Sequence, residues 1–173
     1  LRINLYAAMM AEELGLPSRE VEGIGYSAQM HDVGKIHVHP DIIRKPGSLT
    51  PEEWEIMKHH CEAGAHILGT HPRLALAAEI ALTHHEKWDG SGYPRGLSGE
   101  EIPLSGRIVA ICDVYDALRS KRSYKEGLPH ERAVEIILEG DGRSVPDHFD
   151  PRLLSIFRSR HHRFAEIYAS LAD

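Results

Sequence analysis

The chain has 173 residues, of which 42% are hydrophobic and 27% charged, the mix of an ordinary soluble domain with a core of its own. Its formal net charge of −6 argues against DNA or RNA as a general partner. No apolar run approaches the roughly 18 residues that a membrane span needs. No signal peptide is recognisable at the N-terminus, and the two cysteines lack a disulfide-framework spacing. We therefore expect a cytoplasmic protein with reduced thiols.

The first part of the chain predicts two helices and a long loop. Residues 3–14 show helical periodicity. Ser18 is the expected N-cap of a second helix that reaches about residues 29–32. Residues 33–49 contain three breaker points and are expected to form an ordered loop.

The middle of the chain opens with Thr50-Pro51-Glu52-Glu53, a capping box with proline at the first helical position. This motif predicts a helix from there to about Leu68. A further helix starts at Pro72 and is apolar nearly all round, which indicates a central, buried position.

A loop rich in glycine and proline, residues 87–103, separates these helices from the rest. Helices are then expected over about 104–118 and 129–138, and Phe149-Asp150-Pro151 is expected to start the last helical stretch. Because strand-type alternation is almost absent, the predicted class is all-α, one compact helical bundle over residues 1–173.

Histidine is unusually frequent, since the 13 histidines outnumber the 2 Trp, 6 Tyr and 3 Phe taken together. A lone histidine on a helix is more often a satisfied core or surface residue than a metal ligand. Several histidines and aspartates, however, fall on helices that should converge on one core, namely His31, Asp32, His60, His84, His85 and Asp113. Four imidazoles and two carboxylates suit two or more borderline divalent ions.

A pair of ions matches a definite chemistry. Two ions about 3.5–4 Å apart lower the pKa of a bridging water and stabilise the leaving oxygen in phosphoryl transfer. His84 and His85 diverge by about 100° on a helix, so they can address two adjacent ions. Asp32 is our candidate for the bridging carboxylate.

Charged residues near these positions would complement an anionic substrate. Lys35 follows Asp32 by three residues, and Arg122 and Lys125 follow Asp113. Asp116 lies one helical turn after Asp113 and faces the same way. Asp116 has three alternative roles: it contacts the substrate, it orients a metal ligand, or it forms a simple ion pair on the helix surface.

The remaining histidines and both cysteines receive plainer interpretations. His130 and His161 are expected to be solvated surface residues. Cys61 and Cys112 each adjoin a proposed ligand, but neighbouring helical residues point in different directions. Both cysteines are therefore expected to be small buried hydrophobes.

Several segments resemble the signature of the HD-GYP domain family. They are HDVGK (31–35), KPGSLTPEEWEIMKHH (45–60), HHEKWDGSGYPRGLSGEEIP (84–103), RIVAICDVYDALRSKRSY (107–124) and HFDP (148–151). The resemblance implies an all-α metal-dependent phosphohydrolase that opens cyclic di-GMP to linear pGpG and can continue to GMP. It also implies two or three divalent metal ions, commonly iron or manganese.

The resemblance carries roles onto particular residues. It places the metal ligands at His31, Asp32, His60, His84, His85 and Asp113, with His60 rather than His59 at the family position. It assigns catalysis to Asp32 and Lys35, and substrate contacts to Lys35, Tyr93, Asp116, Arg122 and Lys125.

The resemblance also implies partners. Tyr93 lies in the loop with the Gly-Tyr-Pro motif, which in the family is implicated in substrate access and in contacts with diguanylate cyclase (GGDEF) domains. Tyr93 could equally just pack this loop. An upstream sensor or receiver domain is expected in a longer signalling protein.

Two departures from the family pattern have consequences. The family has a further ligand histidine three residues before the arginine that matches Arg2, and active trinuclear members add a glutamate four residues earlier. Both positions would precede Leu1, so we expect a fragment that binds metal incompletely. The segment HVHPD (37–41) also differs from the family, and His37 and His39 are expected to be loop residues rather than ligands.

Two other functions compete with hydrolysis of cyclic di-GMP. One is a phosphohydrolase for another cyclic or linear nucleotide. The other is a catalytically weak or silent cyclic di-GMP sensor or partner-binding module. Retention of six candidate ligands argues against the silent module, because a decayed site should have lost some of these costly buried groups.

Overall fold

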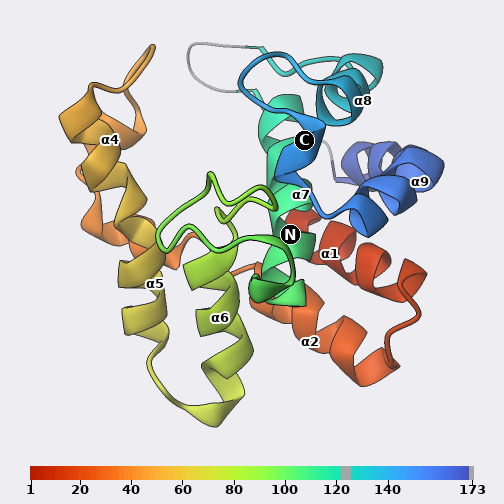
Figure 1. Cartoon of the computed structure of the whole chain (residues 1–173), viewed down its shortest axis with the longest axis horizontal. Helices are drawn as coiled ribbons and strands as arrows, with labels where there is room; N and C mark the ends of the chain where they lie inside the picture. Colours follow the sequence, from red (N-terminus) through yellow and green to blue (C-terminus); the bar gives the residue numbers. More distant parts are fainter. Residues whose placement is uncertain (122–125, 172–173) are drawn as a thin grey trace.

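The computed structural model describes residues 1–121 and 126–171, and within those ranges it contains helices and no strand (Figure 1). This confirms the predicted all-α class. The α-helices are α1 (Arg2–Glu13), α2 (Ser18–Ala28), α3 (Pro40–Ile43), α4 (Pro51–Lys58), α5 (His60–Leu68), α6 (Ala75–Thr83), α7 (Leu104–Arg119), α8 (His130–Glu139) and α9 (Pro151–Ser170). Short 3-10 turns are η1 (Val33–His37), η2 (Pro72–Leu74), η3 (Gly99–Glu101) and η4 (Pro146–His148).

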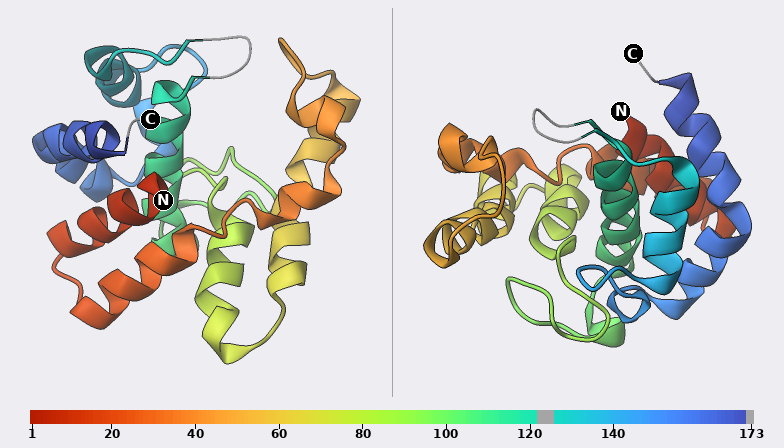
Figure 2. Two further views of the ribbon diagram at one scale, coloured as in Figure 1. Left: turned by 180° about the vertical axis from the view of Figure 1, so that it is seen from behind. Right: turned by 90° about the horizontal axis from the view of Figure 1, so that it is seen from above.

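Helix α7 lies at the centre of the molecule. Figures 1 and 2 show α5 and α6 on one side of it and α8 and α9 on the other. Helix α1 packs against α7, and α2 packs against α1 and α6. Buried residues lie around most of α7, among them Ile108, Ile111 and Tyr115, which are fully inaccessible. A helix in this position can present a polar side chain to an interior site.

Aromatic side chains hold α1, α7 and α9 together. Tyr6 stacks on Phe164 with ring centroids 4.9 Å apart, and Tyr115 meets Phe164 edge to face at 5.0 Å. Burial of each such side chain contributes about 1.5–3 kcal/mol of folding free energy. This packing fixes the helix that carries Asp113 and Asp116.

The helix predicted from Pro51 to Leu68 is wrong in one respect, because it breaks at His59 into α4 and α5. The His59 ring contacts the Glu55 carbonyl at 2.7 Å, and the His60 ring contacts the Met57 carbonyl at 2.6 Å. Side-chain donors thus take carbonyls that would otherwise accept helical N–H groups. The capping box at Thr50 is confirmed.

Three other expectations need correction. The loop predicted over 33–49 contains η1 and the short helix α3. Helix α2 begins at Ser18 itself, with Pro17 at the N-cap and no side-chain capping bond. His130 and His161 are not separate solvated residues, since their rings contact each other at 2.9 Å.

Gly34 fixes how closely the segment after Asp32 approaches α5. A Cβ atom at this position would lie 1.9 Å from the His60 carbonyl oxygen and 2.4 Å from the Gly64 amide nitrogen. Only glycine permits that contact between two backbones. The approach brings Asp32 and His60 into one site.

In the part of the chain that the structure describes, no helix has both the length and the apolar character that crossing a bilayer requires.

Candidate metal centre

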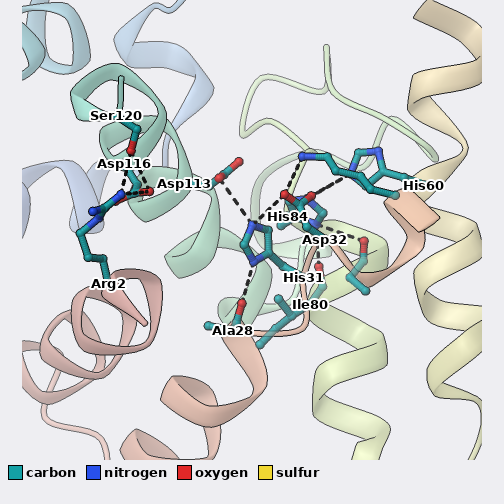
Figure 3. A network of polar contacts seen from close by, with 12 residues as sticks. Arg2, Ala28, His31, Asp32, His60, Ile80, His84, Asp113, Asp116 and Ser120 are labelled. Atoms are coloured by element: carbon teal, nitrogen blue, oxygen red, sulfur yellow. Dashed lines mark hydrogen bonds and ion pairs between the residues drawn. The ribbon is translucent and has the colours of Figure 1, made fainter. Parts of the chain in front are cut away.

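The six residues singled out from the sequence lie close together, and Figure 3 labels all of them except His85. His31 and Asp32 lie between α2 and η1, His60 begins α5, and Asp113 projects from the middle of α7. His84 and His85 directly follow α6. The predicted convergence of these residues is therefore observed.

One group of donor atoms lies between α2, α6 and α7. Three potential ligand atoms lie within 4.8 Å of one another here, one each from His31, His84 and Asp113. His31 Nε2 is 3.5 Å from Asp113 Oδ1. This group could hold one metal ion.

A second group lies between α5 and the end of α6. It combines His60, His84 and His85 with the sulfur of Cys61, and these donor atoms also lie within 4.8 Å of one another. His60 Nε2 is 3.4 Å from His84 Nε2, and Cys61 Sγ is 3.6 Å from His60 Nε2. The expectation that Cys61 points away from the site is wrong, because the turn at His59 brings both side chains to the same point.

Asp32 lies between the two groups. Its Oδ1 is 3.4 Å from His60 Nε2 and 3.8 Å from His84 Nε2, whereas its Oδ2 is 3.4 Å from His31 Nε2. Oδ1 is buried and has no hydrogen-bond partner. An unpaired buried carboxylate oxygen is costly, so this atom calls for a cation.

Backbone carbonyls set the tautomer of three of the imidazoles. The Nδ1 atoms of His31 and His60 lie 2.7 and 2.6 Å from the carbonyl oxygens of Ala28 and Met57. His84 Nδ1 lies 3.1 Å from the carbonyls of Ile80 and Ala81. Carbonyls only accept hydrogen bonds, so each Nδ1 carries a proton. In the neutral rings of His60 and His84, Nε2 therefore turns a lone pair toward the centre.

Electrostatics favour neutral rings in the second group. Burial lowers the pKa of His60 and His85 and brings the pKa of His84 to about 4. Burial is the largest single influence on His31 and disfavours its charged form, but the hydrogen bond to Asp113 and the negative charges of Asp113 and Asp32 together raise the pKa of His31. Neutral imidazoles beside ionised carboxylates are the donors that a divalent ion requires.

These observations together test whether the residues fit a metal. The buried Asp32 Oδ1 lacks a donor, and two lone pairs of His60 and His84 face each other at 3.4 Å. The nitrogen and oxygen donors belong to the class that binds borderline divalent ions. The donor set therefore fits a pair of metal ions, with His84 Nε2 binding one ion of the pair.

His85 is held differently from the other three histidines. Its ring stacks on Tyr93 at a centroid distance of 4.9 Å and an interplanar angle of 25°. Trp54 on α4 meets Tyr93 edge to face at 5.8 Å. The structure thus gives Tyr93 a packing role in the Gly-Tyr-Pro loop.

Glu86 anchors this loop, a role that sequence reasoning missed. Its side chain is 3% exposed and accepts backbone N–H bonds from Arg95 at 2.8 Å and Leu97 at 3.0 Å. A glutamate beside the pair His84-His85 is a signal that could have been noticed. Gly92 makes a further close approach, since a Cβ there would lie 2.5 Å from the His85 carbonyl oxygen.

The residues proposed to bind substrate differ in their ion-pair partners. Lys35 Nζ forms an ion pair with Asp32 Oδ2 at 2.5 Å. Asp116 is paired with Arg2 at 2.6 Å and also accepts from Ser120, which matches the ion-pair alternative (Figure 3). Arg122 and Lys125 lie outside the described residues.

A cavity of about 620 Å³ opens over the centre. Lys35 and Asp116 line it together with His31, Asp32, His84, His85 and Asp113. Tyr93 is not among its lining residues. His37, which ends η1, and His39, which precedes α3, are both exposed. The volume lies in the range of small-molecule sites.

Comparison with known proteins decides the family. The family model described as HD domain matches residues 2–153. The chain belongs to the HD domain family. The resemblance to HD-GYP proteins drawn from the motifs is thereby confirmed at the level of this family.

This HD domain has curated relatives of considerable similarity. It is 45% identical to 3'3'-cGAMP-specific phosphodiesterase 2 of Vibrio cholerae, over 99% of this chain and 33% of the relative. It is 44% identical to a cyclic di-GMP phosphodiesterase of Thermotoga maritima, over 99% of this chain and 46% of the relative. The chain thus spans between a third and a half of the length of these relatives.

A solved structure supports the fold. The crystal structure of a cyclic GMP-AMP specific phosphodiesterase of V. cholerae superposes with a TM-score of 0.66 at 19% identity. The match covers 95% of this chain and 44% of that chain.

Proposed function

We propose that this HD domain hydrolyses cyclic di-GMP to linear pGpG, with GMP as a further product, in bacterial second-messenger signalling. The observation that carries the proposal is the pair of donor groups joined by Asp32, whose two carboxylate oxygens face different imidazoles. Curated relatives named as cyclic dinucleotide phosphodiesterases support the substrate class.

The residues proposed to hold two divalent ions, iron or manganese, are His31, Asp32, His60, His84, His85 and Asp113. When bound, such ions supply an activated water and Lewis acidity toward phosphate oxygens. The chain contributes orientation, because backbone carbonyls fix three of the imidazoles before any ion arrives. Asp32 joins the two groups and is the residue with no substitute.

Lys35 is proposed to neutralise charge on the substrate. Its ammonium lies on the cavity wall beside Asp32, where a phosphate would approach the donor groups. It can donate charge-assisted hydrogen bonds to a phosphate oxygen or to the leaving oxygen. Tyr93, Asp116, Arg122 and Lys125 remain proposed substrate contacts, Asp116 in competition with its ion pair to Arg2.

A second candidate substrate is 3'3'-cGAMP, because a relative 45% identical to this chain is named for that specificity. Partners are proposed by the same reasoning from the family. They are a diguanylate cyclase (GGDEF) domain at the Gly-Tyr-Pro loop and a sensor or receiver domain in a longer protein. A cytoplasmic location is also proposed.

A substrate panel tests the proposal. Metal-loaded protein would be incubated with cyclic di-GMP, 3'3'-cGAMP, cyclic di-AMP and linear pGpG, with separation of products by chromatography. We expect the fastest turnover with cyclic di-GMP and release of pGpG. Fastest turnover of 3'3'-cGAMP would favour the second candidate, and binding of cyclic di-GMP without any product would favour a silent sensor.

A further inference from the structure

Cys61 is buried beside the histidines of the second donor group. It is fully inaccessible, and its Sγ lies 3.6 Å from His60 Nε2. Its sulfur and one nitrogen each of His60, His84 and His85 lie within 4.8 Å of one another. Cys61 is therefore not isolated, since it shares its position with three imidazoles.

The Nε2 lone pairs of His60 and His84 both point into this group. His60 Nδ1 and His84 Nδ1 are both committed to backbone carbonyls, so neither Nε2 carries a proton. The two Nε2 atoms nevertheless face each other at 3.4 Å in the interior. A metal ion between the donors would accept both lone pairs.

Two of the separations in this group equal those between ligands of a tetrahedral metal ion. With metal–nitrogen bonds of about 2.0–2.1 Å and a metal–sulfur bond of about 2.3 Å, tetrahedral ligands lie about 3.3–3.6 Å apart. The observed distances are 3.4 Å between His60 Nε2 and His84 Nε2 and 3.6 Å between His60 Nε2 and Cys61 Sγ. Cys61 thus stands at ligand distance from its neighbour.

We propose that Cys61 is a further protein ligand of the ion held by His60, His84 and His85, binding it as a thiolate. The inference rests on the proposed metal-dependent function and adds a residue to its ligand set. On binding, the S–H proton leaves to solvent and a sulfur–metal bond forms.

A thiolate changes which ions this group prefers. Sulfur is a soft donor and favours zinc, cadmium, cobalt and ferrous iron over manganese and magnesium, which prefer oxygen. Of the two metals proposed above, iron is favoured over manganese at this position. The other group, with His31, His84 and Asp113, has no sulfur donor among its members.

Cys112 provides a matched control. It is the other free cysteine, is equally buried, and adjoins Asp113 in sequence. It is nevertheless absent from both donor groups found in the described residues. Any thiolate signal that comes from the proposed site must survive Cys112→Ser.

The test is a cobalt titration of the metal-free chain, followed by absorption spectroscopy. A thiolate bound to Co²⁺ gives a sulfur-to-metal charge-transfer band in the near ultraviolet. We expect this band in the wild-type chain and in Cys112→Ser, and its loss in Cys61→Ser and Cys61→Ala. Affinity for Cd²⁺ should fall about tenfold or more in the Cys61 variants, with Mn²⁺ affinity little changed.

Two results would overturn the inference: a wild-type spectrum without the band, or a band that persists when Cys61 is replaced. The wild-type spectrum needs no variant, so a poorly folding variant leaves the test intact. Failure of the proposed function is distinguishable. A thiolate band without turnover of any cyclic dinucleotide would contradict the proposed hydrolase function and support Cys61 as a ligand. Turnover without the band would support the hydrolase function and contradict Cys61 as a ligand.

Discussion

At the residue scale, the arrangement depends most on Asp32. One of its oxygens is buried without a hydrogen-bond partner, and the other is shared between His31 and Lys35. The Asp32 carboxylate lies 3.4 Å from His31 through one oxygen and 3.4 Å from His60 through the other. Loss of this side chain should therefore affect both groups at once.

Replacement of Asp32 by Ala is expected to release bound metal and to reduce hydrolysis by about a hundredfold or more. The reason is that both groups lose a charged oxygen donor. Metal content by elemental analysis and product formation measure the effect. Asp41→Ala is the control, since Asp41 is an exposed aspartate of the following helix. Full activity in Asp32→Ala would contradict the role given to it.

Replacement of Lys35 by Gln should separate metal binding from substrate handling. Loss of a charged hydrogen bond costs about 1.5–3 kcal/mol, so kcat/KM should fall roughly ten- to hundredfold. Metal content should stay at the wild-type level. Lys58→Gln is the control, because Lys58 pairs with Glu55 on α4. Loss of metal in Lys35→Gln would show that the lysine supports the ligands instead.

At the element scale, the loop after α6 is tied to the site by Glu86 and Tyr93. The carboxylate of Glu86 accepts two backbone N–H groups, and the ring of Tyr93 covers His85. The loop thus helps to orient His85. In the described residues, the His85 ring has no hydrogen bond to a backbone carbonyl, unlike the rings of the other three proposed histidine ligands.

Glu86→Gln should destabilise the protein by about 1–3 kcal/mol, because an amide NH₂ would face a buried N–H donor. Hydrogen exchange should increase across residues 89–98. Glu100→Gln is the control, since that side chain is largely exposed. Unchanged exchange in Glu86→Gln would mean that the loop is held by other contacts.

Helices α7, α8 and α9 are joined by a chain of polar contacts. Arg119 donates to Tyr115 Oη, which lies 2.8 Å from His130 Nδ1, and His130 Nε2 lies 2.9 Å from His161 Nδ1. Since arginine only donates, Tyr115 donates in turn to His130. Burial, with the charges of nearby His161 and Arg119, lowers the pKa of His130.

The lowered pKa of His130 predicts that the protein loses stability in mild acid. A folded-state pKa below the unfolded value means that the unfolded chain binds more protons, so the stabilisation is present above about pH 6.5 and is lost as the pH falls. His130→Asn keeps an acceptor for Tyr115. Between pH 7.5 and 5.5 the melting temperature should fall in both proteins. The fall in His130→Asn should be smaller than the fall in wild type by about 2 °C or more.

The exposed His66 supplies the control for that measurement. His66→Asn should show the same pH dependence of the melting temperature as wild type. An equal pH dependence in His130→Asn and wild type would contradict the role of His130.

At the scale of the whole molecule, much of the fold could be predicted because it depends on local signals. The capping box at Thr50 and the apolar helix before His84 are each determined by a short stretch of consecutive residues. The break at His59 could not be predicted in this way, because it depends on which carbonyls two rings contact.

The candidate site follows the same division. Its histidines and aspartates could be named from residue type and from the family resemblance. The position of Cys61 depends on the direction of α5 after the break, and the role of Glu86 depends on a distant loop folding back. Contacts of that kind arise from tertiary structure and leave little trace in local sequence pattern.

The central claim is that two metal ions bind the joined donor groups and are both needed to open cyclic di-GMP. The most direct test is a stoichiometric titration of metal-free chain with Fe²⁺, without oxygen, while bound metal and pGpG are measured together. We predict little product at one equivalent and a steep rise as the second equivalent binds. Full turnover at one equivalent, or turnover that persists in excess chelator, would contradict the claim.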